Sequence, residues 1–175
     1  MRSRLTVTLA LLAMFMSGCS SVSTKDIQVN ALADSKVDLS GYETYGWLVN
    51  AAILNDTYGQ WEPPAFDADA EVKYLIDREL RKRGMSESSA DPDIFVAFAA
   101  GINMDALRLR GGPKGKMNVQ NIPRGGLTIL FVGSQTGVIL WMGVATGDIQ
   151  ERPDIKTAKA RLDYAVTKIL KELPK

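Results

Sequence analysis

The sequence predicts an α+β domain in which two amphipathic helices pack on one face of a largely antiparallel sheet of about five strands. Two segments, residues 67–83 and 154–173, carry apolar residues at helical spacing. About five shorter segments are rich in apolar, β-branched and aromatic residues and are bounded by turn formers. Two of these segments are joined by a short loop that contains glycine, which is typical of a hairpin, and hence of antiparallel pairing.

The chain begins with the anatomy of a secretory signal: a basic start, a short apolar run and small residues before Cys19. The apolar run is shorter than the roughly 20 residues that a membrane-spanning helix needs. Cys19 is the only cysteine, and its place after Ser17 and Gly18 resembles the lipobox of bacterial lipoproteins, in which the cysteine is lipidated and becomes the new N-terminus. The alternative is an ordinary signal peptide with an incidental cysteine, although a free thiol is a liability in an oxidising envelope. We therefore expect a lipoprotein signal peptide at residues 1–18 and a lipidated tether at residues 19–26.

This N-terminus predicts where the protein resides. Acyl chains such as palmitate on Cys19 would anchor the chain to a membrane of the cell envelope. Ser20 follows the cysteine, and its resemblance to enterobacterial sorting signals favours the outer membrane, with the protein facing the periplasm. Residues 27–175 then form a single α+β domain, as their number suggests.

Composition excludes several classes of function. The chain has 21 Lys and Arg residues, 20 Asp and Glu residues and no histidine. Near-neutral charge gives no electrostatic basis for nucleic-acid binding. The lack of histidine excludes Ser-His-Asp and Cys-His catalysis. The sequence thus predicts no catalytic residue, no metal site and no cofactor.

A carboxylate-based hydrolase is the remaining enzymatic alternative. The acids available to it lie where a helix needs them for capping or solvation. Several have basic residues four positions later, which predicts ion pairs such as Asp77–Arg81 and Glu79–Arg83. We therefore expect that the protein is not an enzyme. These acids are Asp67, Asp69, Glu71, Asp77 and Glu79.

The first strands and loop follow the tether. Residues 26–32 alternate weakly between apolar and polar, and residues 42–48 are dense in aromatic and β-branched residues, so both predict strands. Residues 55–64 carry Asn, Asp, Gly and Pro and predict an exposed loop. Its Tyr58 and Trp61 are expected to fold back onto the edge of the domain; the alternative is that they stack on a sugar or clamp a peptide.

The first helix, residues 67–83, has acidic residues in its first turn and basic residues in its last, as the helix dipole favours. Gly84 is predicted to end it as the left-handed residue of a Schellman motif, with Leu80 and Met85 in contact. The Asp-x-Asp-x-Glu spacing indicates capping rather than calcium binding, because Val72 stands where an EF-hand loop needs glycine.

A turn at residues 91–93 precedes a predicted buried strand at residues 94–102. Residues 103–126 are expected to form a long basic loop, which either binds an anionic partner such as a lipid phosphate or is simply solvated. No nucleotide site is predicted, since Arg110 and Met117 replace the glycine and the Ser/Thr of a phosphate-binding loop.

Residues 127–132 and 138–145 predict a β-hairpin that is apolar on both faces. A sheet covered on one side should alternate with polar residues, so a second cover is expected: the long loop, the N-terminal strand, a second copy of the chain or another envelope protein. The candidate partner surface consists of Trp141, Arg108, Arg110, Lys114 and Lys116. The last helix, residues 154–173, has the strongest periodic pattern in the chain.

The order of these motifs resembles a family of bacterial lipoproteins built on a domain of unknown function, DUF4136. The motifs are the lipobox, Tyr-x-Thr-Tyr-x-Trp from Tyr42, Arg-Gly at the end of the first helix, Asp-Pro-Asp before an apolar strand, Leu-Trp-x-Gly from Leu140, and a last helix that ends in Leu-Pro. The resemblance implies an α+β fold and an envelope location but no activity. We therefore expect a lipid-anchored binding or accessory module, with a structural subunit of an envelope assembly, or a homodimer, as alternatives.

Overall fold

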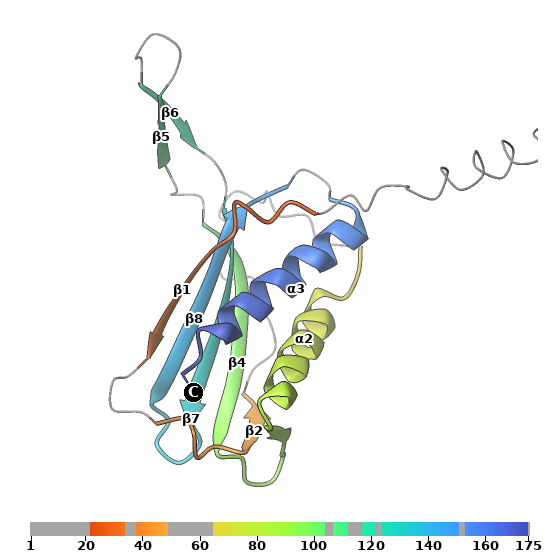
Figure 1. Ribbon diagram of the computed structural model, residues 1–175, viewed down its shortest axis with the longest axis vertical. Coiled ribbons are helices and arrows are strands. Elements are labelled where there is room, and N and C mark those ends of the chain that lie inside the picture. The colour runs from red at the N-terminus through yellow and green to blue at the C-terminus, as the bar shows by residue number, and fades with distance from the viewer. Residues whose placement is uncertain are drawn as a thin grey trace, which may run out of the picture.

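Figure 1 shows the computed structural model, which describes residues 22–33, 38–48, 65–103, 107–111, 117–121, 124–150 and 153–174. Within these residues, a six-stranded sheet has the order β1-β8-β7-β4-β2-β3. Its strands are β1 (Gln28–Ala33), β2 (Thr44–Trp47), β3 (Ser86–Glu87), β4 (Ile94–Asn103), β7 (Arg124–Gly133) and β8 (Ile139–Asp148). The helices α2 (Ala68–Lys82) and α3 (Ile155–Lys171) lie on one face of the sheet.

The predicted fold class is confirmed. Strands β1, β8, β7 and β4 pair antiparallel in turn, and β2 pairs parallel with both β4 and β3. The sheet is therefore largely antiparallel, with six strands rather than about five, because the two-residue β3 adds an edge that carries no sequence pattern.

The predicted ending of α2 is also confirmed. Gly84 has a φ of 86°, the Gly84 N–H donates to the carbonyl of Arg81 (3.0 Å), and the Met85 N–H donates to the carbonyl of Leu80 (3.1 Å). These are the two hydrogen bonds of a Schellman motif, and Leu80 and Met85 are both buried. Asp67 caps the other end of α2, where its carboxylate accepts from the Ala70 N–H at 3.0 Å.

The prediction of one long loop at residues 103–126 is corrected. Strands β5 (Leu107–Gly111) and β6 (Met117–Asn121) pair antiparallel in a separate two-stranded sheet, and residues 124–126 belong to β7. Glycines and prolines in the segment suggested a loop, but the ladder forms between them. The predicted aromatic loop at residues 55–64, with Tyr58 and Trp61, lies outside the described residues.

The two faces of the sheet differ. On β7, Leu127, Ile129 and Phe131 are buried toward the helices, whereas Thr128, Leu130 and Val132 alternate with them and are only half-buried. The N-terminal strand does not cover this second face, because β1 joins the edge of the sheet beside β8. Both helices that the structure describes lie on the other face, so we call this one the open sheet face; the ladder pairs place on it apolar residues that include Leu32, Phe95, Ala97, Leu130, Val132, Ile139, Met142 and Val144.

Trp141 lies in the core, not on a surface. Only 1% of it is exposed, and its ring packs against Phe131 with 5.2 Å between ring centroids. The indole also lies against Gly143, near Ile169 of α3. The placement of Trp141 on a partner surface is therefore wrong: this face of β8 is the one that the helices cover.

No helix in the described part of the chain is long and apolar enough to span a membrane.

Candidate functional site

Four charged side chains meet where the chain enters the sheet. The Arg161 guanidinium, on α3, binds both carboxylate oxygens of Asp26, at 2.9 Å from Nη1 and 2.5 Å from Nη2. Arg161 Nη1 also donates to the carbonyl of Ser23 at 2.6 Å. Asp26 in turn accepts from the backbone N–H of Asp148 at 2.9 Å. We call Asp26, Arg161, Arg124 and Asp148 the N-terminal clamp, because together they fix the segment that precedes β1.

The ion pair between Arg161 and Asp26 strongly favours the charged form of the Asp26 carboxyl. The hydrogen bond from Arg161 is the largest influence on Asp26, and it holds the pKa of that carboxyl down at about 2, against the opposing effect of burial. The side chains are 12% exposed for Arg161 and 18% for Asp26. A bidentate, largely buried pair of this kind fixes both the position and the orientation of the two side chains.

Arg124 completes the clamp from β7. It is 8% exposed, and its Nη2 donates to the carbonyls of Asp26 and Thr146, both at 3.1 Å. Its Nε lies 3.8 Å from Asp148 Oδ1, and both atoms are buried without a hydrogen-bond partner in the described residues. The attraction here is ionic without a hydrogen bond, so the clamp rests mainly on Asp26.

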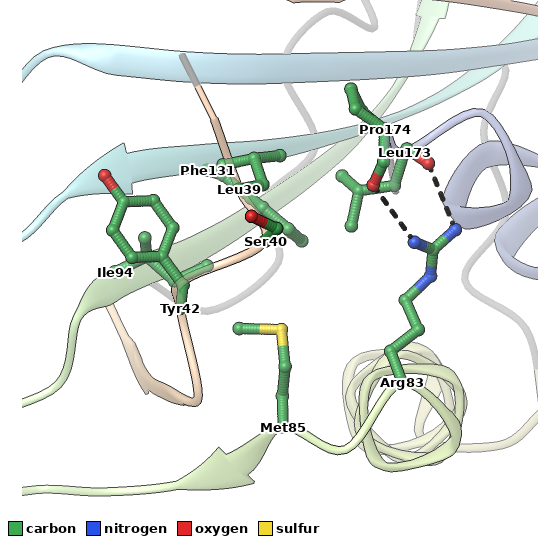
Figure 2. Close-up of a pocket in the computed structure, with 9 residues that line it drawn as sticks. All are labelled: Leu39, Ser40, Tyr42, Arg83, Met85, Ile94, Phe131, Leu173 and Pro174. Atoms are coloured by element: carbon green, nitrogen blue, oxygen red, sulfur yellow. Dashed lines mark hydrogen bonds between the residues drawn. The ribbon is translucent and has the colours of Figure 1, made fainter.

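A cavity of about 300 Å³ lies at the opposite end of the sheet, where β4 begins (Figure 2). Its wall is mainly apolar, and Arg83 stands at its side. The Arg83 guanidinium donates to the carbonyls of Leu170 (2.6 Å), Leu173 (3.2 Å) and Pro174 (3.3 Å), and so caps the end of α3. The apolar and aromatic residues that line it include Leu39, Tyr42, Met85, Ile94, Phe131 and Leu173. With its arginine engaged in this way, the cavity is an apolar recess rather than a charged binding site.

Two of the ion pairs predicted on α2 do not form. Asp77 is 7% exposed and accepts a hydrogen bond from the Tyr45 hydroxyl at 2.7 Å instead of pairing with Arg81. Burial, together with this bond, raises the pKa of Tyr45. Glu79 pairs with Lys82 and Arg78 rather than with Arg83. Tertiary partners thus replace the local pairs that spacing alone suggested.

Residues 29–175 match the family described as Domain of unknown function (DUF4136). The chain belongs to this family. The resemblance seen in its motifs is therefore confirmed, and the family assignment covers nearly the whole domain.

Solved structures resemble the DUF4136 domain at low sequence identity. A DUF4136 family protein from Bacteroides thetaiotaomicron is 11% identical, with a TM-score of 0.52, over 82% of this chain and 95% of that chain. A minor lipoprotein from Acinetobacter baumannii is 12% identical over 75% of this chain and 92% of that chain; its TM-score of 0.35 is too low to carry an argument. The first supports the fold alone.

Among curated proteins, the RNA1 polyprotein of Cowpea mosaic virus (strain SB) is 30% identical over 132 residues, or 73% of this chain. The chain spans only 7% of the polyprotein's length. This likeness carries no assignment of function to the DUF4136 domain.

The motifs of this DUF4136 chain have structural roles. The Asp93 carboxylate of Asp-Pro-Asp accepts from the backbone N–H groups of Glu43 (2.9 Å) and Thr44 (2.8 Å) and from the Thr44 hydroxyl (2.7 Å). These bonds hold the pKa of Asp93 below its usual range. The Tyr-x-Thr-Tyr-x-Trp and Asp-Pro-Asp motifs therefore bind each other through these hydrogen bonds, and this contact aligns the parallel strands β2 and β4.

The predicted site residues of the DUF4136 domain are not gathered in one place. Cys19, Lys114 and Lys116 lie outside the described residues. Arg108 and Arg110 lie on β5, for which the structure describes the backbone. Within the described residues, there is no group of three or more His, Cys, Asp or Glu side chains that could hold a metal ion. The sequence pattern did not predict the N-terminal clamp. Its members are up to 135 residues apart, so no short-range spacing indicates them.

Proposed function

We propose that this DUF4136 protein is a lipid-anchored lipoprotein of the cell envelope that acts as a non-catalytic binding or accessory module. The signal-like N-terminus and Cys19 support the anchor, and Ser20 favours the outer membrane with the domain in the periplasm. The clamp adds support, because Asp26, seven residues after Cys19, is held firmly to α3 and so gives the tether a fixed point of departure.

The observation that carries the binding role is the open sheet face. Leu32, Met142 and Leu130 form a continuous row across β1, β8 and β7, and Leu32 is 68% exposed. The polar neighbours of this row on the same face, Asn30 and Thr128, are uncharged. An apolar surface with polar margins is typical of a contact site for another protein.

A structural subunit of an envelope assembly is the second candidate, and the same face favours it. The two roles differ in permanence: an obligate subunit exposes this face only until it assembles, whereas a binding module exposes it between encounters. A homodimer through this face is one form of the second role.

The test is to crosslink the tagged protein in intact envelopes and to compare wild type with the double variant Leu130→Ser, Met142→Ser. We expect the variant to lose the crosslinked species by tenfold or more, because serine removes most of the apolar area. Tyr74→Ser serves as the control, since Tyr74 is 60% exposed on α2, which lies on the other face. Equal crosslinking in the wild type and the double variant would rule out this face, and a species of twice the chain mass would identify the homodimer.

A further inference from the structure

The tether and the β5–β6 hairpin leave the domain at the same end of the sheet. Asn103, the last residue of β4, pairs with Arg124, the first residue of β7, and Arg124 pairs with Asp148 at the end of β8. The Asp148 N–H binds Asp26, where the chain enters the sheet. Figure 1 shows β5 and β6 beyond this end of the sheet.

The hairpin must stay near this end because its links to the sheet are short. Three residues separate β4 from β5, and two separate β6 from β7. At a maximum of about 3.5 Å per step from one residue to the next, these links span at most about 14 Å and about 10 Å. By the same measure, the seven steps from Cys19 to Asp26 span at most about 25 Å.

The register of the hairpin places its apolar residues and its arginines at alternate ladder positions. Leu109 pairs with Val119, and the neighbouring ladder positions pair Arg108 with Gln120 and Arg110 with Asn118. Because alternate positions of a ladder lie on opposite faces, Leu107, Leu109, Val119 and Met117 share one face, and both arginines share the other. Neither strand contains an acidic residue.

An element with an apolar face and a basic face suits the surface of an anionic bilayer, where apolar residues enter the interface and cations meet phosphates. The tether would hold this end of the domain within about 25 Å of a membrane, and so would keep the local concentration of headgroups high. Among anionic partners, headgroups are therefore favoured over an acidic protein.

We propose that the β5–β6 hairpin docks on anionic lipid headgroups of the membrane to which the chain is tethered, so that the sheet stands end-on to the bilayer. The tethering rests on the function proposed above. So does the choice of headgroups over an acidic protein, whereas the affinity of the hairpin for anionic lipid is tested without the anchor.

The experiment uses the whole mature chain, residues 19–175, with Cys19→Ser, so that no lipid contributes. Its partitioning is measured by co-sedimentation with vesicles of phosphatidylcholine alone and with vesicles that also contain the anionic lipid phosphatidylglycerol, which gives them a negative surface potential. We expect binding to the anionic vesicles only. Each basic residue near such a surface raises partitioning by about fivefold, so Arg108→Gln with Arg110→Gln should lower it by tenfold or more.

The matched control is Arg81→Gln with Lys171→Gln, which removes the same charge from exposed positions near the C-terminal ends of α2 and α3 and should leave partitioning within twofold. Leu109→Ser with Val119→Ser should also weaken binding. Wild-type partitioning that is absent, equal on neutral vesicles, or unchanged by the arginine variant would overturn the docking. Fatty-acid labelling of the wild-type chain is measured separately. Its absence would overturn the anchor at Cys19 but not the docking.

Discussion

Gly143 lies on the face of β8 that enters the core and leaves room there for the indole of Trp141. A Cβ atom built at this position would overlap Ile169 Cγ2 and would lie 2.5 Å from Cη2 of Trp141. The space beside Gly143 is therefore occupied by the indole, which packs between the sheet and α3. The Leu-Trp-x-Gly motif is a packing unit: the tryptophan fills the volume that the glycine leaves.

We expect Gly143→Ala to lower the free energy of unfolding by about 1–3 kcal/mol, because an added methyl group overpacks the core. Urea unfolding followed by tryptophan fluorescence measures the change. Gly125→Ala is the matched control on β7, since its Cβ would lie 3.8 Å from the nearest atom, Ile149 Cγ1. Equal losses in the two variants would show that β-strand glycines in general, and not the indole, are responsible.

At the scale of elements, periodicity predicted both helices, because each buries a single stripe. It could not choose the buried face of β8: Trp141 and Met142 lie on opposite faces and are both apolar, so alternation carries no information there. Nor could spacing along α2 reveal that Asp77 binds Tyr45, because the tyrosine is 32 residues away. The β5–β6 ladder was missed for another reason, since its short strands are flanked by glycine and proline.

The clamp joins β1 to α3, and its strength should depend on pH. The pKa of Asp26 falls to about 2 in the folded chain from a usual value of 3.8, so its carboxylate stabilises the fold fully above about pH 4. That stabilisation is lost as the pH falls from 4 toward 2. We expect Asp26→Asn to be less stable than wild type by about 1–2 kcal/mol at pH 7, and the two to converge near pH 2.

Denaturant unfolding at pH 7, 5, 3 and 2 provides this measurement. Asp91→Asn, which removes an exposed carboxylate, controls for the general effect of charge and should show no such convergence. A gap between wild type and Asp26→Asn that remained constant down to pH 2 would mean that the pair contributes by packing, not by charge.

At the scale of the whole molecule, the clamp and the cavity lie at opposite ends of the sheet. The anchor proposed at Cys19 would therefore present the apolar cavity away from the membrane. Because Cys19 precedes the described domain, we expect the anchor to affect where the protein lies and not how stable the fold is.

We accordingly expect Cys19→Ala to abolish fatty-acid labelling and to move the protein from the membrane fraction to the soluble envelope fraction, or to leave it unprocessed. The midpoint of thermal unfolding of the released domain should change by no more than about 1 °C, since a surface change outside the core alters stability little. Labelling with radioactive or clickable palmitate makes the measurement. A variant that still takes up the label would remove the basis for the anchor.

The position of β1 also determines how the domain bears mechanical load. The chain turns at Lys25 and Asp26 before it enters β1, with the Ile27 N–H donating to the carbonyl of Thr24 at 3.1 Å, and β1 is then paired along its length with β8 through six residue pairs. A pull on the tether would therefore meet this turn and the Arg161–Asp26 pair before it reached the ladder between β1 and β8. The ladder would carry load only after this pair had parted, so the clamp shields the edge of the sheet from forces on the tether.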